Sequence, residues 1–355
     1  MSPEIYMRRC LDLAQLAKGH TTPNPMVGAV LVHNERIIGE GWHTEYGKAH
    51  AEVHCLESVA NEDRYLIPQS TMYVSLEPCA HYGKTPPCAL RLVYEKVKEV
   101  IIANIDPFEK VGGKGIDILK QNDVEVKTGL LEKEGAWVNR RFFSFHTKNR
   151  PYIILKWAQT KQGFFAPPDR SRFQITNAAS QALVHKWRTE ESAIMVGTNT
   201  AMYDNPQLTA RTYTGNQPLR IVLDTELKIP ASHHVFNADA ETWIINQHKE
   251  ERDGNIHFVR MDLANVLPQL LSRLQHHNIL SLIVEGGASL LQSFILLGLW
   301  DEARVFTGQA SLPHGISAPI LNNSVPAYAT ELDGDMLNVF TNKNNPYTYI
   351  KGMQL

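Results

Sequence analysis

A histidine, a glutamate and two cysteines in the first third of the chain are residue types that suit metal-assisted hydrolysis. His50 and Glu52 flank one alanine, and Cys79 and Cys88 follow, each directly after a proline. A neutral imidazole and two thiolates suit Zn²⁺, and three protein ligands leave a fourth position open for water. The cation lowers the pKa of that water, which becomes a nucleophile near neutral pH. We therefore expect His50, Cys79 and Cys88 to bind zinc, with Glu52 off the metal as a proton carrier.

The order of these residues follows the plan of zinc deaminases, in which H-x-E precedes a Pro-Cys pair and a further cysteine. Here eight residues separate the two cysteines, whereas the short motif has two. A rival interpretation is a closed structural site, because His54 lies four residues after His50 on the same face of an expected helix. As a fourth ligand, His54 would leave no water to activate and no role for Glu52. The simplest alternative is that both cysteines are small buried apolar residues.

Composition is typical of a soluble globular protein with two domains. The chain has 355 residues, of which 43% are hydrophobic and 20% charged. A formal net charge of -2 provides no basic field, so we expect no nucleic-acid partner. No apolar run approaches the roughly 20 residues that span a bilayer, and no signal peptide is recognisable, so we expect neither a membrane span nor secretion. Four cysteines in so long a chain do not resemble a disulfide framework, which favours the cytoplasm.

Strands and helices alternate in the first half, which predicts an α/β layered domain with helices on both faces of its sheet. The metal ligands fall near helix starts, His50 in a first turn and the two cysteines on either side of a turn into the next helix. Backbone N–H groups at such positions favour thiolates and other negative charge. We expect helices at residues 4–17, 49–60 and 89–94, and strands at 28–32, 36–40, 72–76 and 100–103.

A second α/β domain is expected after a boundary near residue 147, so the domains would cover residues 1–146 and 147–355. Glu285, Gly286 and Gly287 join a strand to a helix, where a phosphate can bind helix N–H groups. By itself this turn is weak evidence for a phosphate site, and it is not the G-x-G-x-x-G dinucleotide-binding fingerprint. We expect strands at 152–155, 193–197, 219–224, 280–284 and 346–351, and helices at 177–188, 263–277 and from 288 through 297, with a short helical piece after 198.

Several motifs resemble the riboflavin-biosynthesis bifunctional deaminase–reductase family. The Thr-Pro-Pro-Cys ending at Cys88 separates this branch from cytidine, guanine and tRNA-adenosine deaminases. The resemblance implies a cytidine-deaminase-like α/β/α domain that exchanges a ring amino group of a diamino-hydroxy-pyrimidinone carrying phosphoribosylamine for oxygen, releasing ammonia. The motifs are Thr22–Gly28, Gly39–His43, His50–Val53, Leu76–Cys79, Thr85–Cys88, Asp106-Pro107 and Val111–Gly115.

This resemblance assigns zinc to His50, Cys79 and Cys88, and proton transfer from the water to the leaving amine to Glu52. By resemblance only, Asn24 and His43 contact the substrate. If the resemblance is set aside, Asn24 is interpreted as a turn residue and His43 is interpreted as a histidine at the end of a strand.

The second half has Lys156 after a strand and further motifs at residues 196–200, 204–206, 208–211 and 284–287. These motifs resemble the reductase half of the same family, which has a dihydrofolate-reductase-like α/β fold. That reductase uses NADPH to reduce the ribosyl carbon of the deaminated product to an open ribityl chain. Arg188 and Arg211 make physical sense as phosphate ligands, since a guanidinium donates two parallel hydrogen bonds, although surface ion pairs are an alternative. The resemblance assigns cofactor contacts to Ala158, Thr200, Asp204 and Gly287, and substrate contacts to Lys156, Arg188, Leu208, Arg211 and Glu285.

Two departures from the family bear on reduction. Many members have Ser-Leu-Asp-Gly where this chain has Thr160-Lys161-Gln162-Gly163, and tryptophan where it has Gln174. An active zinc deaminase with a weakened or lost reductase is therefore the enzymatic alternative. A rival of another class is a protein that binds phosphorylated nucleotides around a closed zinc and does no chemistry. A homo-oligomer is compatible with the sequence.

Overall fold

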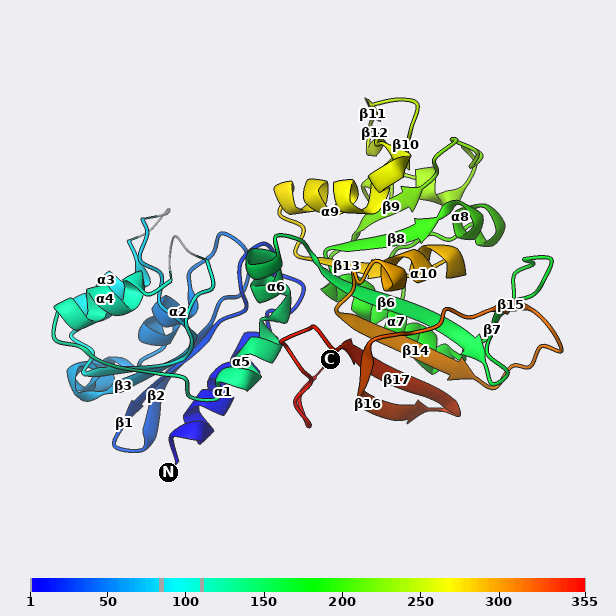
Figure 1. Cartoon of the computed structure of the whole chain (residues 1–355). Helices are drawn as coiled ribbons and strands as arrows, with labels where there is room; N and C mark the ends of the chain where they lie inside the picture. The colour runs from blue at the N-terminus through cyan, green and yellow to red at the C-terminus, as the bar shows by residue number, and fades with distance from the viewer. Residues whose placement is uncertain (1, 83–85, 109–111, 355) are drawn as a thin grey trace. The chain divides into compact units, whose positions relative to one another are not determined.

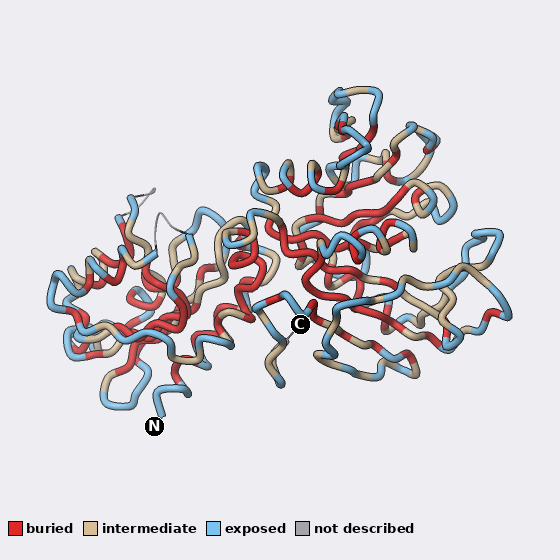
Figure 2. The backbone as a smooth tube through the Cα atoms, viewed as in Figure 1, coloured by how far each residue is buried: buried red, intermediate tan, exposed pale blue. Residues whose placement is uncertain are grey.

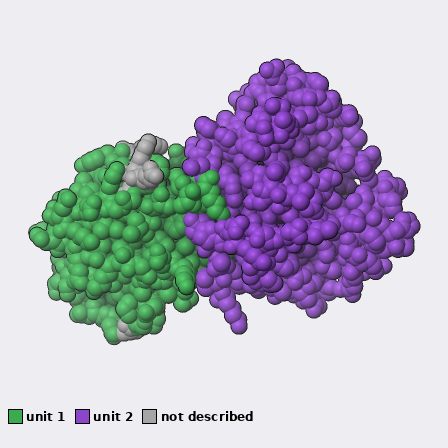
Figure 3. Space-filling view, viewed as in Figure 1, with its two compact units in different colours: residues 1–148, 352–355 green, residues 149–351 purple. Residues whose placement is uncertain are grey.

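The computed structural model describes residues 2–82, 86–108 and 112–354. The chain divides into two compact units, residues 1–148 with 352–355 and residues 149–351, which Figure 3 colours green and purple. The expected boundary near 147 falls in the last turn of helix α6 (Arg140–Lys148). The final residues group with the first unit, where the Trp137 indole donates a 2.9 Å hydrogen bond to the Gln354 carbonyl. Thr85 and Val111, which belong to the motifs above, lie outside the described residues.

The sheet of the first unit has the strand order β2-β1-β3-β4-β5. Strand β1 pairs antiparallel with β2 and β3, whereas β3, β4 and β5 run parallel. Figure 1 shows its elements, which are the strands β1 (Gly28–His33), β2 (Arg36–Trp42), β3 (Thr71–Leu76), β4 (Glu99–Asn104) and β5 (Glu125–Thr128), the helices α1 (Pro3–Gln15), α2 (Ala51–Glu57), α3 (Cys88–Tyr94), α4 (Lys114–Gln121), α5 (Glu132–Val138) and α6, and the 3₁₀ segment η1 (Asn61–Gln69).

Both faces of this sheet are buried, because successive side chains of a strand point to opposite faces. Leu31 packs with α2, α3 and α4 on one face, and its neighbours Val30 and Val32 pack with α1 on the other. Helix α2 lies close against β2, since a Cβ on Gly41 would come within 2.3 Å of the Cys55 nitrogen. The expected α/β/α layering is therefore present.

The second unit is built on a mixed sheet of order β11-β12-β10-β9-β8-β13-β6-β14-β17-β16. Strands β12 through β14 in this order run parallel, and β11, β17 and β16 run antiparallel to their neighbours. A small pair of β7 and β15 stands apart.

The strands of the second unit are β6 (Tyr152–Thr160), β7 (Phe164–Ala166), β8 (Ala193–Gly197), β9 (Leu219–Leu223), β10 (Thr242–Asn246), β11 (Glu251–Asp253), β12 (Ile256–Arg260), β13 (Ser281–Val284), β14 (Glu302–Gly308), β15 (Ile316–Ser317), β16 (Ser324–Leu332) and β17 (Asp335–Asn342). Its helical segments are α7 (Ala178–Glu190), α8 (Thr198–Asp204), α9 (Val266–His276) and α10 (Ala288–Leu296), with short 3₁₀ turns η2 (His234–Phe236) and η3 (Leu263–Asn265).

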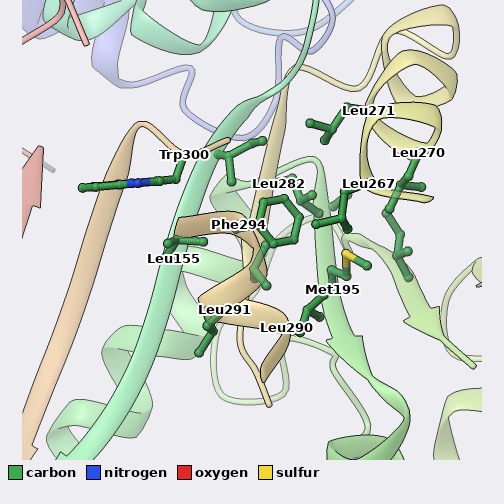
Figure 4. Packing of buried hydrophobic residues seen from close by; sticks show 14 of the residues in the cluster. Leu155, Met195, Leu267, Leu270, Leu271, Leu282, Leu290, Leu291, Phe294 and Trp300 are labelled. Carbon is green, nitrogen blue, oxygen red and sulfur yellow. The ribbon is translucent and has the colours of Figure 1, made fainter. Parts of the chain in front are cut away.

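The core of the second unit lies between its sheet and the helices α9 and α10, as Figure 4 shows. Helix α9 buries Leu267, Leu270, Leu271 and Leu274, whose spacing places them on one apolar stripe. Phe294 of α10 packs in the same cluster. The strands β8, β10 and β13 of this sheet are buried along their whole length, and the sheet is mostly buried in Figure 2. The apolar spacing that predicted helix 263–277 thus reflects this core, although its first residues form η3.

One expected element is wrong. Residues 346–351 form no strand; the sheet is completed by the hairpin of β16 and β17, and β17 pairs with β14. Pro346 begins the expected strand and has no N–H to donate to a ladder. Strand β16 contains Pro326, and its exposed residues do not alternate regularly with the less exposed ones. The true strand therefore lacks a clear period-2 pattern.

No helix in the ranges described above is long and apolar enough to cross a bilayer.

Candidate active sites

His50 is the N-cap of α2, with extended backbone angles of φ -75° and ψ 164°. The sequence places His50 in the first turn of this helix, but the helix begins at Ala51, one residue after His50. Glu52 follows inside the first turn. The close approach of α2 to β2 at Gly41 fixes where this helix start lies.

Cys79 and Cys88 meet His50 at the start of the next helix. Cys88 is the first residue of α3, and its N–H donates to the Cys79 sulfur at 3.3 Å. His50 Nδ1 lies 3.5 Å from Cys79 Sγ and 3.3 Å from Cys88 Sγ. In a tetrahedral zinc site with a Zn–S distance of about 2.3 Å and Zn–N of about 2.1 Å, nitrogen and sulfur ligands lie roughly 3.6 Å apart. The donor set therefore fits zinc in both chemistry and spacing.

His54 does not complete a closed site. Its Nδ1 donates to the Trp42 carbonyl at 2.9 Å. Among the described residues, the group whose ligand atoms lie within 4.8 Å of one another contains His50, Cys79 and Cys88. The shared helical face assumed for His54 does not exist, since His50 precedes the helix.

Glu52 lies beside these ligands and is 3% exposed. Burial, and to a smaller extent the neighbouring Cys79 sulfur, raise the pKa of Glu52 to about 7. The hydrogen bond from the Cys88 thiol, with contributions from His50 and the Cys88 N–H, lowers the pKa of Cys79 to about 4. The site thus combines a stabilised thiolate with a carboxyl group that exchanges protons near neutral pH.

Asn24 and His43 are close to the same group of residues. His43 Nδ1 donates to the Ala49 carbonyl at 3.1 Å, so Nε2 accepts from the Asn24 amide at 3.2 Å. The His43 ring lies edge-on to His50, with 5.3 Å between centroids. Burial lowers the pKa of His43, which favours a neutral ring.

A cavity of about 620 Å³ lies in the second unit, beyond the carboxyl ends of β8 and β13. Ligands of parallel α/β sheets bind in this position. Strand β6 continues past the end of β13, which pairs with it only to Leu155. The residues expected to contact the cofactor all line this cavity, namely Ala158, Thr200, Asp204 and Gly287.

Gly287 caps the start of α10 at this cavity. A Cβ there would lie 3.2 Å from Thr200 Oγ1, so the glycine leaves backbone N–H groups open to a ligand. The N-terminus of a helix favours phosphate groups, and the cavity is large enough for a drug-sized ligand. These features fit a phosphate-bearing cofactor such as NADPH.

Lys156, Arg188 and Glu285 form one charged cluster on the cavity wall. Arg188 donates to Glu285 through Nε at 3.1 Å and Nη2 at 2.7 Å, and Lys156 Nζ lies 3.7 Å from the same carboxylate. Burial alone would raise the pKa of Glu285, but Arg188 and Lys156 lower it to about 2. Burial lowers the pKa of Lys156. The Arg188 fork expected to grip a phosphate is thus largely engaged by a protein carboxylate.

The remaining predicted residues divide between the cavity and its surroundings. Leu208 lines it, with a φ of 59°. Arg211 is not among the lining residues; its N–H donates to His185 Nδ1 at 3.2 Å and its Nη1 to Gln207 Oε1 at 3.1 Å. Burial, and then Arg188, lower the pKa of Arg211.

The two positions at which this chain departs from many members of the family, Gln162 and Gln174, differ in their location. Gln174 lines the cavity, whereas Gln162 donates to Ser311 Oγ at 3.0 Å outside the lining.

Sequence reasoning missed the cavity wall formed by Phe165, Arg170 and Tyr203. Arg170 lies over the Tyr203 ring, 5.5 Å from its centroid. The available signal was the basic run after Pro167-Pro168, which has no motif spacing. Sequence reasoning also missed Glu77, which it included only as one residue of the motif that ends at Cys79.

The chain matches two known protein families along most of its length. Residues 1–104 match the cytidine and deoxycytidylate deaminase zinc-binding region, and residues 151–310 match the RibD C-terminal domain. The riboflavin biosynthesis protein RibD of Aquifex aeolicus is 38% identical over 318 residues, covering 88% of each chain. That of Bacillus amyloliquefaciens is 38% identical over 314 residues, covering 85% of this chain and 83% of the relative.

Solved structures are similar over both units. A diaminohydroxyphosphoribosylaminopyrimidine deaminase/5-amino-6-(5-phosphoribosylamino)uracil reductase from Thermotoga maritima has a TM-score of 0.88 and 31% identity, covering 96% of this chain and 98% of its own. Acinetobacter baumannii RibD has a TM-score of 0.87 and 30% identity, covering 95% and 98%.

Proposed function

Since the chain belongs to the family of the riboflavin biosynthesis protein RibD, we propose that its domains perform two successive steps on one phosphoribosylaminopyrimidine. The chain is a bifunctional enzyme, with a cytidine-deaminase-like zinc-binding domain and a dihydrofolate-reductase-like domain of the NADPH-using type. We assign deamination to residues 1–146 and reduction to residues 147–355.

The first step is hydrolytic deamination of 2,5-diamino-6-(5-phosphoribosylamino)pyrimidin-4-one. His50, Cys79 and Cys88 would hold the zinc ion, which when bound would lower the pKa of a water molecule toward neutral. Glu52 accepts a proton from that water and delivers it to the leaving amine, so that oxygen replaces nitrogen on the ring and ammonia departs. Asn24 and the neutral His43 orient the ring through their polar atoms.

The observation that supports this step is the set of 3.3 and 3.5 Å distances from His50 Nδ1 to the two sulfurs, with Glu52 buried beside them and outside the ligand group. A Glu52→Gln enzyme should retain one zinc per chain and lose roughly 10²–10⁴-fold in ammonia release, the usual contribution of general acid–base catalysis. Glu57→Gln, an exposed position on the same helix, is the matched control. Unchanged ammonia release in zinc-loaded Glu52→Gln would remove the proton-transfer role.

The second step reduces the ribosyl group of the deaminated product to an open ribityl chain. NADPH, when bound, would supply the hydride. We assign its contacts to Ala158, Thr200, Asp204 and Gly287, which line the cavity. Substrate contacts are assigned to Lys156, Arg188, Leu208, Arg211 and Glu285. The Arg188 fork is engaged by Glu285. Arg211 is the better candidate for a phosphate ligand, because among the described contacts its guanidinium donates to one side chain, Gln207, through Nη1.

Both steps are separable by assay. Ammonia release on the diaminopyrimidine tests the first half, and loss of NADPH absorbance with deaminated product supplied tests the second. Ammonia release without NADPH consumption would identify the alternative, a deaminase with a lost reductase, for which Gln174 on the cavity wall is the structural reason. The absence of both would favour a binding protein.

The cytoplasm is the proposed location, since Cys10, Cys55, Cys79 and Cys88 form no disulfide. Light scattering of the purified protein tests whether it assembles as a homo-oligomer.

A further inference from the structure

Glu77 is a buried carboxylate next to the metal-binding loop. It lies between the end of β3 and Pro78, is 4% exposed, and does not belong to the ligand group. Its Oε2 accepts hydrogen bonds from the N–H groups of Asp106 at 3.2 Å and Gly113 at 3.0 Å. Its Oε1 accepts from Gly115 at 2.9 Å and Ile116 at 3.3 Å. One side chain therefore holds the end of β4 and the start of α4 together.

These contacts satisfy N–H groups that helix α4 cannot satisfy itself, since the first N–H groups of a helix have no intrahelical partner. The N-cap of α4 is Gly113, which has no side chain to accept them. A negative charge at a helix N-terminus is also favoured by the aligned peptide dipoles. Glu77 thus caps α4 from a position 36 residues away along the chain.

The segments that Glu77 holds face the metal-binding loop. A Cβ on Gly115 would lie 2.0 Å from the Pro78 carbonyl oxygen, so α4 packs directly on the residue before Cys79. The Asp106 carboxylate accepts the Phe108 N–H at 2.8 Å. Burial raises the pKa of Asp106 to about 6, and its charged neighbours are Glu77, His81 and Cys79.

We propose that Glu77 is a positioning residue of the deaminase site: its carboxylate fixes Asp106 and the start of α4 against Pro78, the residue before Cys79, and so sets the side of the site next to Cys79. The proposal rests on the deaminase function assigned above. Because Glu77 touches neither Glu52 nor His50 in the described contacts, its loss should affect substrate binding more than the chemical step.

Glu77→Gln tests this with little change in volume. An amide nitrogen cannot accept hydrogen bonds, so two of the N–H groups lose their acceptor. We expect KM for the diaminopyrimidine to rise roughly tenfold or more, the effect of losing a charge-assisted hydrogen bond. The value of kcat should stay within about threefold, with one zinc per chain. Hydrogen exchange of the peptide covering 112–121 should accelerate about tenfold or more in metal-free and zinc-loaded protein alike.

Two further variants complete the test. Asp117→Asn is the matched control, because Asp117 is an exposed carboxylate in the first turn of the same helix. Its KM should be that of the wild type, and loss of one charge at the helix dipole should accelerate exchange by less than about fivefold. Gly115→Ala forces α4 away from Pro78 without changing Glu77, and it should also raise KM. This variant keeps the proposal testable should Glu77→Gln fail to fold.

Faster exchange in Glu77→Gln with an unchanged KM would reduce Glu77 to a structural cap and overturn the proposal. Unchanged exchange would show that the carboxylate does not hold α4. Failure of the assigned deaminase function would appear separately, as absence of ammonia release from the wild-type enzyme.

Discussion

Replacing Glu285 by glutamine should destabilise the second unit more than any ordinary surface substitution. Glu285 faces two cations, with Arg188 Nη2 at 2.7 Å and Lys156 Nζ at 3.7 Å. The side chains of Lys156, Arg188 and Glu285 are 15%, 11% and 8% exposed. Glutamine preserves the shape of the cluster but leaves both cations buried without a counter-charge.

The structure sets the size of the effect in two ways. Removing one partner of a buried ion pair costs about 3–5 kcal/mol. Burial works against ionisation of Glu285, but Arg188 and Lys156 overcome it and lower the pKa from its ordinary value of 4.5 to about 2, a difference that corresponds to roughly 3 kcal/mol. For a unit of about 200 residues, each kcal/mol lowers Tm by about 2–4 °C. We therefore expect Tm of the second unit to fall by about 6–20 °C.

The pH dependence gives an independent check. Because the pKa of Glu285 is depressed in the folded state, its stabilisation is fully present above the ordinary pKa of 4.5 and is lost as pH falls toward about 2. In calorimetric scans the difference in unfolding free energy between wild type and Glu285→Gln should be constant from about pH 6 to about pH 8. This difference should disappear below about pH 4.5.

The control for this prediction is Glu251→Gln, which removes the exposed partner of Lys249 and should cost less than about 1 kcal/mol. A cost below about 1 kcal/mol for Glu285→Gln itself, or a gap that does not vary with pH, would refute the reasoning.

Two further substitutions test the cofactor cavity and a buried arginine of the second unit. Gly287→Ala places a methyl group 3.2 Å from Thr200 Oγ1 and should weaken NADPH binding by roughly tenfold; a fluorescence titration with an unaltered Kd would contradict the cavity assignment. Arg220→Met removes a fully buried guanidinium that donates to the carbonyls of His234, Asn237 and Ala240. Leaving these acceptors buried should cost about 3 kcal/mol or more, and a loss below about 1 kcal/mol in urea unfolding would show that water replaces the arginine.

The zinc site was the most predictable part of the molecule. Three ligand types with an adjacent carboxylate restrict the chemistry to few possibilities, and an α/β alternation places such residues at helix starts. The position of His50 was less predictable, because α2 begins at Ala51, two residues after the start expected from the sequence. His54 is excluded as a ligand by its own contact, because its Nδ1 donates to the Trp42 carbonyl at 2.9 Å.

The residues assigned to the cofactor cavity could be chosen from the sequence, but the contacts between the residues of its wall could not. The residues assigned to NADPH all line it, yet nothing local indicates that Glu285 occupies the Arg188 fork, 97 positions away in sequence. The closing hairpin of β16 and β17 was missed for a related reason: its register is set by pairing with β14, not by its own alternation. Long-range pairing of this kind has no period that a sequence window can detect.

Glu77 shows why a positioning residue is harder to find than a ligand. A metal ligand is restricted in type, so His50, Cys79 and Cys88 are visible as letters in the sequence. The donors to Glu77 are backbone N–H groups, which every residue but proline carries. Only the glycine at 115 has a steric reason to be there, since any side chain would strike Pro78. A buried carboxylate between a strand end and a metal ligand is thus worth testing for backbone donors in the fold, because its partners leave almost no trace in the sequence.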